Sequence, residues 1–255
     1  MKTEIFSLPV AGSVRAFLLA FISFWIAIIL APILTNFLYR HKLGKKIRKE
    51  KAPIFSKLHA EKENIPTMGG LLIWGTTLLV TVVFNLSREA TWLPLALMVL
   101  AGVLGVVDDL INIWGKGGIK SRIKIVLQIV LALVGAWWFY FKLGWGERPI
   151  HIPGVGDFAI GWWYIPLFIF VIVGSMNAVN ITDGLDGLAG GLSALAFGAL
   201  GIVALVQHQI GLAAFSATIL GAILGFLWFN IYPARFFMGD TGSMAIGASL
   251  GVVAM

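Results

Sequence analysis

The chain has 255 residues, of which 59% are apolar and only 12% are charged, and it contains no cysteine. This composition is typical of an integral membrane protein and leaves no room for a sizeable soluble domain. The lack of cysteine excludes disulfides, thiolate metal sites and cysteine nucleophiles. A net charge of +7 would suit nucleic acid. The basic residues gather in one loop, however, so membrane topology explains the charge better and we expect no nucleic-acid partner.

Apolar runs of membrane-spanning length recur along the chain. A helix needs roughly 20 apolar residues to cross a bilayer. We predict spans at residues 14–39, 68–85, 92–111, 123–143, 162–179, 188–207 and 212–230, and a last run that starts near Ser243 and is cut by the chain end. The sequence therefore predicts an all-α, polytopic membrane helix bundle with about eight spans, forming one domain over residues 1–255.

The distribution of charge predicts the topology. Residues 40–67 carry nine of the nineteen Lys and Arg residues, which places this loop in the cytoplasm and the N-terminus outside. Because successive spans cross the membrane in opposite directions, residues 112–122, 180–187 and 231–242 should lie on the cytoplasmic side. Residues 86–91, 144–161 and 208–211 should lie on the outer side. Of the six aspartates, all except Asp157 fall on the predicted cytoplasmic face: Asp108, Asp109, Asp183, Asp186 and Asp240.

The polar stretch at residues 177–191 lies between two apolar runs. Asn177, Asn180, Asp183 and Asp186 recur every three residues, so on a helical path they would line one side. Interspersed glycines would let the backbone approach a ligand. Because polar groups at a membrane edge are costly to desolvate, this cluster predicts a functional site.

The second polar feature is the pair Asp108-Asp109 near the end of the third span. Adjacent helical residues point about 100° apart, so we expect different roles for the two carboxylates. Such a pair suits a proton acceptor or a divalent-ion site, or it is a helix-end pair neutralised by a cation. Lys124, one turn into the next span, would either hold a phosphate or reach toward the membrane interface.

The third polar feature is the stretch at residues 236–243. Asp240 lies between glycines, so we expect open backbone amides there, with Ser243 as the N-cap of the next helix. Such amides favour phosphate. Phe236 or Phe237 would stack on a base or pack at the interface. Oxygen ligands beside phosphate point to magnesium, whereas the scattered histidines do not have zinc-site spacing.

These stretches resemble one family closely. Residues 66–70, 108–109, 177–189 and 237–243, in this order, look like the motifs of the phospho-N-acetylmuramoyl-pentapeptide transferases. This family belongs to the polyprenyl-phosphate N-acetylhexosamine-1-phosphate transferase superfamily. Its members have about ten spans, so the resemblance implies further spans beyond Met255. It also suggests a homodimer.

The resemblance implies a reaction at the bacterial inner membrane, with the active site facing the cytoplasm. Phospho-MurNAc-pentapeptide passes from UDP-MurNAc-pentapeptide to undecaprenyl phosphate, giving lipid I and UMP in peptidoglycan synthesis, with Mg²⁺. By motif position, the implied catalytic residues are Asp108 as base, Asp109, Lys124 and Asp240. The implied magnesium ligands are Asp240 and Asn180, and the implied substrate-binding residues are Lys62, Thr67, Asn180, Asp183, Asp186, Asn230 and Phe237.

Three other hypotheses stay open at this point. A sister enzyme of the superfamily would use a UDP-N-acetylhexosamine without a peptide. An ion-coupled transporter would also use intramembrane acids, although transport predicts them near mid-span rather than at one edge. An inactive fragment or scaffold is the third.

Overall fold

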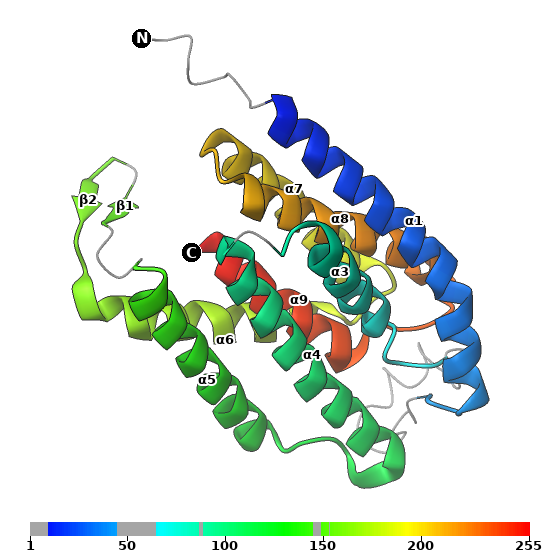
Figure 1. The fold of residues 1–255 in the computed structure, drawn as a ribbon. Coiled ribbons are helices and arrows are strands. Elements are labelled where there is room, and N and C mark those ends of the chain that lie inside the picture. Colours follow the sequence, from blue (N-terminus) through cyan, green and yellow to red (C-terminus); the bar gives the residue numbers. More distant parts are fainter. Residues whose placement is uncertain (1–9, 45–64, 87–88, 145–148, 153) are drawn as a thin grey trace.

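The computed structural model describes residues 10–44, 65–86, 89–144, 149–152 and 154–255. Most of the predicted basic loop, including Lys62, lies outside the described residues. In the described ranges the chain forms eight long helices (Figure 1): α1 (Val10–Arg40), α3 (Gly70–Phe84), α4 (Trp92–Ile111), α5 (Ser121–Trp137), α6 (Tyr164–Thr182), α7 (Leu188–Val206), α8 (Ile210–Asn230) and α9 (Gly239–Ala254).

The prediction of an all-α polytopic bundle is confirmed. Six helical segments of the described chain are long and apolar enough to cross a membrane: Val10–Arg40, Glu89–Gly115, Ser121–Lys142, Gly161–Thr182, Leu188–Val206 and Ile210–Asn230. Helices α3 and α9 are shorter, with 15 and 16 residues. Because the carbonyls and amides of a helix bond to each other, apolar runs of this kind satisfy their backbone without water.

Short elements join these helices. Single-turn 3-10 helices, η2 (Glu89–Thr91) and η6 (Gly161–Trp163), precede α4 and α6, and single π-helical turns, η3 (Asn112–Lys116) and η4 (Trp138–Lys142), follow α4 and α5. The predicted outer loop at residues 144–161 contains a small antiparallel hairpin, which the sequence analysis did not predict. Its strands β1 (Ile150–Ile152) and β2 (Gly156–Phe158) pair Ile150 with Phe158.

Helix α9 lies at the centre of the bundle, surrounded by α3, α4, α6 and α7 (Figure 1). Small residues allow this close packing. A Cβ on Gly70 would collide with the backbone of Gly242, and one on Gly247 would meet the backbone of Met176 at 2.5 Å. The residues of α9 from Thr241 to Ser249 are all buried. The central helix is therefore rich in Gly, Ala and Ser because its neighbours touch its backbone.

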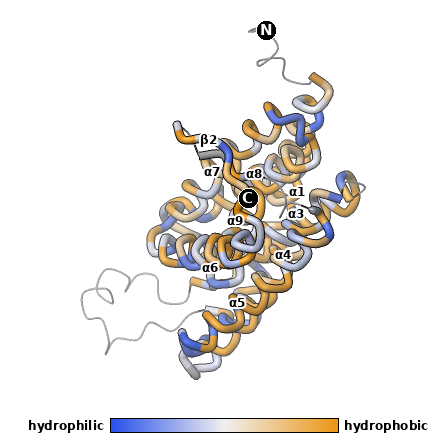
Figure 2. Tube along the Cα trace, turned by 90° about the vertical axis from the view of Figure 1, so that its left-hand side faces the viewer, coloured by the Kyte–Doolittle hydropathy of each residue, from blue (hydrophilic) through white to orange (hydrophobic). Residues whose placement is uncertain are grey.

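Large apolar side chains cover the outside of the bundle, and hydrophobic colouring dominates the helical trace in Figure 2. On α1, Phe17 is 80% exposed and Ile29 is 64% exposed; on α6, Phe170 is 75% exposed. An apolar surface of this extent would cause a soluble protein to aggregate. It fits a bundle whose outer faces contact lipid.

Candidate active site

The predicted site residues that the structure describes gather at one end of the bundle, where α1, α4, α6 and α8 end and α3, α5, α7 and α9 begin. We call this the acidic end. Hydrogen bonds between backbone or side-chain atoms join these helix ends, including Gly69 N to Phe237 O at 2.8 Å and Tyr39 Oη to Arg235 O at 3.2 Å. The prediction that separate pieces of chain bring their carboxylates to one face is confirmed by this arrangement.

Asp240 and Lys124 form the centre of the acidic end. Lys124 Nζ donates to Asp240 Oδ2 at 2.6 Å and also forms an ion pair with Asp108. Asn180 Nδ2 donates to Asp240 Oδ1 at 2.6 Å and to Ser243 Oγ at 2.8 Å. One ammonium group thus bridges carboxylates from α4 and α9, and α6 supplies an amide on the other side of Asp240.

The adjacent acids Asp108 and Asp109 point to different partners, as the helix geometry predicts. Asp108 contacts Lys124, and its second oxygen accepts the N–H of Ile119. Asp109 is only 1% exposed and accepts from Thr241 N at 3.0 Å and Thr241 Oγ1 at 2.8 Å. Asp108 therefore belongs to the charged centre, whereas Asp109 fastens the start of α9 to α4.

The start of α9 differs from the sequence prediction. The helix begins at Gly239 rather than near Ser243, so Asp240 lies in its first turn. Ser243 is not the N-cap, because its hydroxyl donates to Gly239 O within the helix, at 3.1 Å. Two of the first amides are not open either: Gly239 N donates to Asp183 Oδ2 at 3.1 Å, and Thr241 N to Asp109. Carboxylates from other segments thus satisfy two of the first-turn amides that we expected to be free for phosphate.

The polar stretch at residues 177–191 does not form one continuous helix, because α6 ends at Thr182. Asn177 and Asn180 lie on the helix, whereas Asp183 and Asp186 lie in the turn that follows it. Asp186 Oδ2 accepts the N–H of Ala234 at 3.4 Å. The two aspartates are half-buried; Asp186 contacts the α8–α9 connection and Asp183 contacts the first residue of α9, which places them beside the charged centre.

Two predicted substrate-binding residues are buried. Asn230 is 3% exposed; its Oδ1 accepts the N–H of Gly187 at 3.0 Å, and its Nδ2 donates to Phe236 O at 2.9 Å. Thr67 is 2% exposed. Its hydroxyl lies so close to Gly239 that a Cβ on this glycine would collide with it. Both residues contact the backbone segments that carry the site. Their direct contact with a substrate stays a prediction.

The two phenylalanines that precede Met238 have different environments. Phe236 is fully buried and stacks on Phe229 with ring centroids 6.1 Å apart, so it has no face free for a base. Phe237 is only partly buried, and its backbone joins Pro66 and Gly69. Of the two aromatic candidates, Phe237 is therefore the one that a ligand can reach.

The donor set of the acidic end fits a magnesium ion that is completed by a substrate. In the described part of the chain, no group of three or more His, Cys, Asp or Glu side chains is arranged to hold a metal. Asp108 and Asp240 nevertheless share one cation, the Lys124 ammonium, with the Asn180 amide beside them. Mg²⁺ in phosphoryl-transfer sites takes one or two carboxylates and completes its shell with water and substrate phosphate.

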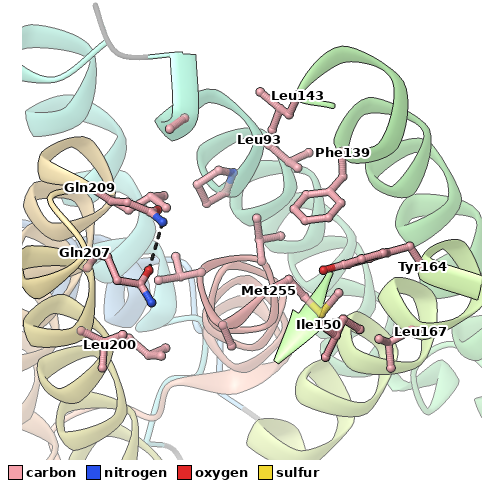
Figure 3. Close-up of a pocket in the computed structure, with 18 of the residues that line it drawn as sticks. Leu93, Phe139, Leu143, Ile150, Tyr164, Leu167, Leu200, Gln207, Gln209 and Met255 are labelled. Atoms are coloured by element: carbon pink, nitrogen blue, oxygen red, sulfur yellow. Dashed lines mark hydrogen bonds between the residues drawn. The ribbon is translucent and has the colours of Figure 1, made fainter. Parts of the chain in front are cut away.

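A separate cavity of about 520 Å³ lies at the opposite end of the bundle, around the end of α9 (Figure 3). Phe139 and Tyr164 line one side; on the other, Gln209 Nε2 donates to Gln207 Oε1 at 3.0 Å. The rest of its lining is mainly apolar. Because the described residues around it include no carboxylate or basic side chain, it does not offer the chemistry of the acidic end.

One polar residue near the site was missed by the sequence analysis. Gln128 is fully buried in α5, four residues after Lys124, and accepts a hydrogen bond from Asn177 at 2.8 Å. An amide inside a membrane-spanning run is itself a signal of function. That rule would have identified Gln128 from the sequence.

The fold and this charged centre define a polytopic membrane protein with a polar site at one end of its bundle, and comparisons with known proteins identify it as a transferase. A model of glycosyl transferase family 4 matches residues 91–255, and the phospho-N-acetylmuramoyl-pentapeptide-transferase signature 1 matches residues 62–73. The chain belongs to the phospho-N-acetylmuramoyl-pentapeptide transferase family, as the resemblance of its motifs predicted.

Similar proteins of that name come from several bacteria. The relative from Geobacillus thermodenitrificans is 42% identical over 241 residues, which cover 92% of this chain and 72% of the relative. The relative from Chloroflexus aurantiacus is 42% identical over 251 residues, covering 94% and 67%. The relative from Bacillus mycoides is 39% identical over 244 residues, covering 92% and 72%.

Proposed function

We propose that this chain transfers phospho-MurNAc-pentapeptide from UDP-MurNAc-pentapeptide to undecaprenyl phosphate, giving lipid I and UMP, with Mg²⁺ as cofactor. The observation that carries the proposal is the bridge from Asp108 through Lys124 to Asp240, with Asn180 on its far side. The names of the relatives point to the same donor, since each is called a phospho-N-acetylmuramoyl-pentapeptide-transferase.

The charges of the site suit a reaction between two anions. The acceptor is a phosphate and the donor is a pyrophosphate, so their approach is repulsive unless cations lie between them. Lys124 supplies a cation within bonding distance of Asp240. In the proposed reaction it releases a carboxylate and turns to a phosphate oxygen. Bound Mg²⁺ would supply further charge neutralisation at the phosphates, held by Asp240 with Asn180 nearby.

Asp108 is the proposed base for the acceptor phosphate. Its carboxylate is oriented by two contacts, with the Lys124 ammonium and with the N–H of Ile119. A base must be held within hydrogen-bond reach of the proton that it takes. Asp109 stands in the proposal as the adjacent positioning residue, because its described contacts are with Thr241.

The donor nucleotide is proposed to lie on the side of the centre formed by the α6–α7 turn and the α8–α9 connection. Phe237 supplies an accessible aromatic ring for the uracil. Asp183 and Asp186 border the same region through their bonds to Gly239 and Ala234. Lys62 and Thr67 complete the proposed binding set, Lys62 from outside the described residues.

The proposed setting follows from the distribution of charge. With the basic segment 40–67 in the cytoplasm, the acidic end faces the cytoplasm and the N-terminus lies outside. The bacterial origin of the relatives supports the inner membrane as the proposed location. This orientation gives the nucleotide access from the cytoplasm and the polyprenyl chain access from the bilayer. A homodimer is the proposed assembly.

The test is release of UMP by the purified chain in lipid nanodiscs, with UDP-MurNAc-pentapeptide, undecaprenyl phosphate and Mg²⁺. We expect UMP and a lipid-linked product only when all three are present. A parallel reaction with UDP-N-acetylglucosamine separates the proposal from the sister-enzyme alternative. No UMP from the muramoyl donor, or faster turnover of the acetylglucosamine donor, would defeat the proposal.

A further inference from the structure

A second polar contact lies directly below the charged centre. Gln128 is four residues after Lys124 on α5, and Asn177 is three residues before Asn180 on α6. Residues at these spacings lie on the same face of a helix, one turn apart. Asn177 Nδ2 donates to Gln128 Oε1 at 2.8 Å and to Val173 O at 2.8 Å. A side-chain hydrogen bond thus joins α5 and α6 directly at this level, whereas one turn above it Lys124 and Asn180 both bond to Asp240.

The apolar packing of α5 does not reach the level of Lys124. From Ser121 to Leu127 every side chain except Lys124 is exposed, and Gln128 is the first that is fully buried. The apolar contacts begin at Leu131 and Ala132, and further along the helix Gly135 packs against Leu97 and Phe168. The first half of α5, which carries the lysine, is therefore held by polar contacts.

Burial of this amide is costly. Gln128 is 0% exposed, and its Nε2 has no hydrogen-bond partner within the described residues. A buried amide group without a partner costs roughly 1–3 kcal/mol, whereas leucine would fill the same place without that cost. A polar residue kept at such a position needs a reason beyond packing.

We propose that the Gln128–Asn177 hydrogen bond is a positioning device for the transferase reaction, which sets the spacing of α5 and α6 so that Lys124 and Asn180 both reach Asp240. The inference rests on the proposed function, and it assigns no contact with substrate to either amide. The two bonds to Asp240 are each 2.6 Å long, so a small displacement of α5 breaks the one from Lys124.

Kinetics of apolar variants give the first test. Gln128→Leu is expected to lower kcat for UMP release by about 10- to 100-fold, the range for a misplacement of about 1 Å, with KM values changed by less than about threefold. Asn177→Leu should do the same. Because both variants break the same Gln128–Asn177 hydrogen bond, the double variant should be no slower than the slower of the two single variants. Additive losses, or single variants within about threefold of wild-type kcat, would overturn the proposal.

A matched control separates positioning from stability. Asn85 is also a fully buried amide, at the opposite end of the bundle, and its Nδ2 donates to Gly211 O at 3.0 Å. Asn85→Leu should lower the thermal unfolding temperature in nanodiscs and leave kcat per folded molecule unchanged. If Gln128→Leu does not fold, Gln128→Asn provides the same test, because it keeps the amide and shortens its reach by one methylene.

A distance measurement tests the inference without any activity. The chain has no cysteine, so spin labels can be placed cleanly at Arg122→Cys on α5 and Ile181→Cys on α6, both exposed. Gln128→Leu is expected to shift or broaden the distance distribution between these labels, and Asn85→Leu to leave it unchanged. An unaltered distribution in Gln128→Leu would refute the positioning role. If the wild-type chain releases no UMP, the proposed function fails, and this distance still decides the structural claim.

Discussion

Replacement of Asp240 by asparagine tests the charged centre at the carboxylate that contacts both Lys124 and Asn180. The change keeps the size of the side chain and removes its charge. In the structure this carboxylate accepts one bond from Lys124 and one from Asn180, both at 2.6 Å. Asparagine has only one oxygen to accept with, so one of these bonds is lost and the other no longer involves a carboxylate.

The two expected effects of Asp240→Asn differ in size. Hydrogen bonds to charged groups contribute about 1.5–3 kcal/mol each to stability. Lys124 keeps its ion pair with Asp108, so the variant should fold, losing about 1.5–3 kcal/mol of unfolding free energy from the missing bond and about 1 kcal/mol more from the weakened one. Loss of one preorganised charge-stabilising group in an active site costs about 10²–10³-fold in kcat. Because Asp240 is also the proposed magnesium ligand, we expect kcat to fall by at least about 10³-fold.

The assay is UMP release under saturating substrates, measured on protein whose folded fraction is known from thermal unfolding. Asp157→Asn is the matched control, because Asp157 is exposed in β2, outside the acidic end. It should retain wild-type kcat. A folded Asp240→Asn variant with kcat within about tenfold of the wild type would refute the role assigned to this carboxylate.

Three further predictions concern the surroundings of the centre. Asp109→Asn weakens two hydrogen bonds to Thr241 and should lower the unfolding free energy by about 1–3 kcal/mol, seen as a lower melting temperature; an unchanged value would contradict its fastening role. Gly70→Ala brings a Cβ against the backbone of Gly242 and should destabilise the bundle by about 1–3 kcal/mol or more, whereas a wild-type melting temperature would show that α3 can move aside. Phe237→Leu should raise KM for the UDP-linked donor about tenfold, because one aromatic stacking contact is lost, and should leave KM for undecaprenyl phosphate unchanged. Equal changes in both KM values would show that the Phe237 ring does not contact the nucleotide.

The helices of this fold could be predicted from the sequence because each apolar run must satisfy its backbone internally. The predicted limits of the third span, residues 92–111, agree with α4 as observed. The hairpin at Ile150–Phe158 was not predicted, since its strands are only three residues long and carry no alternating pattern of useful length. The start of α9 was placed about one turn too late, because glycines around Asp240 read as a loop.

The site could be predicted less completely. The different directions of Asp108 and Asp109 follow from helix geometry alone, and the structure shows them. That Asp183 and Asp109 cap the first turn of α9 depends on which helix ends meet, and local sequence patterns do not contain that information. The same holds for Gln128, whose partner lies 49 residues away on another helix.

We propose that one divalent cation binds to Asp240 at the acidic end, beside Asn180 and close to the proposed base Asp108. The most direct measurement is the anomalous difference map of crystals soaked with Mn²⁺, which replaces Mg²⁺, and UMP. We predict one strong peak about 2.0–2.2 Å from an Asp240 oxygen, with Asp108 and Asn180 around it. A peak away from Asp240, or bound UMP at the opposite end of the bundle, would contradict the account.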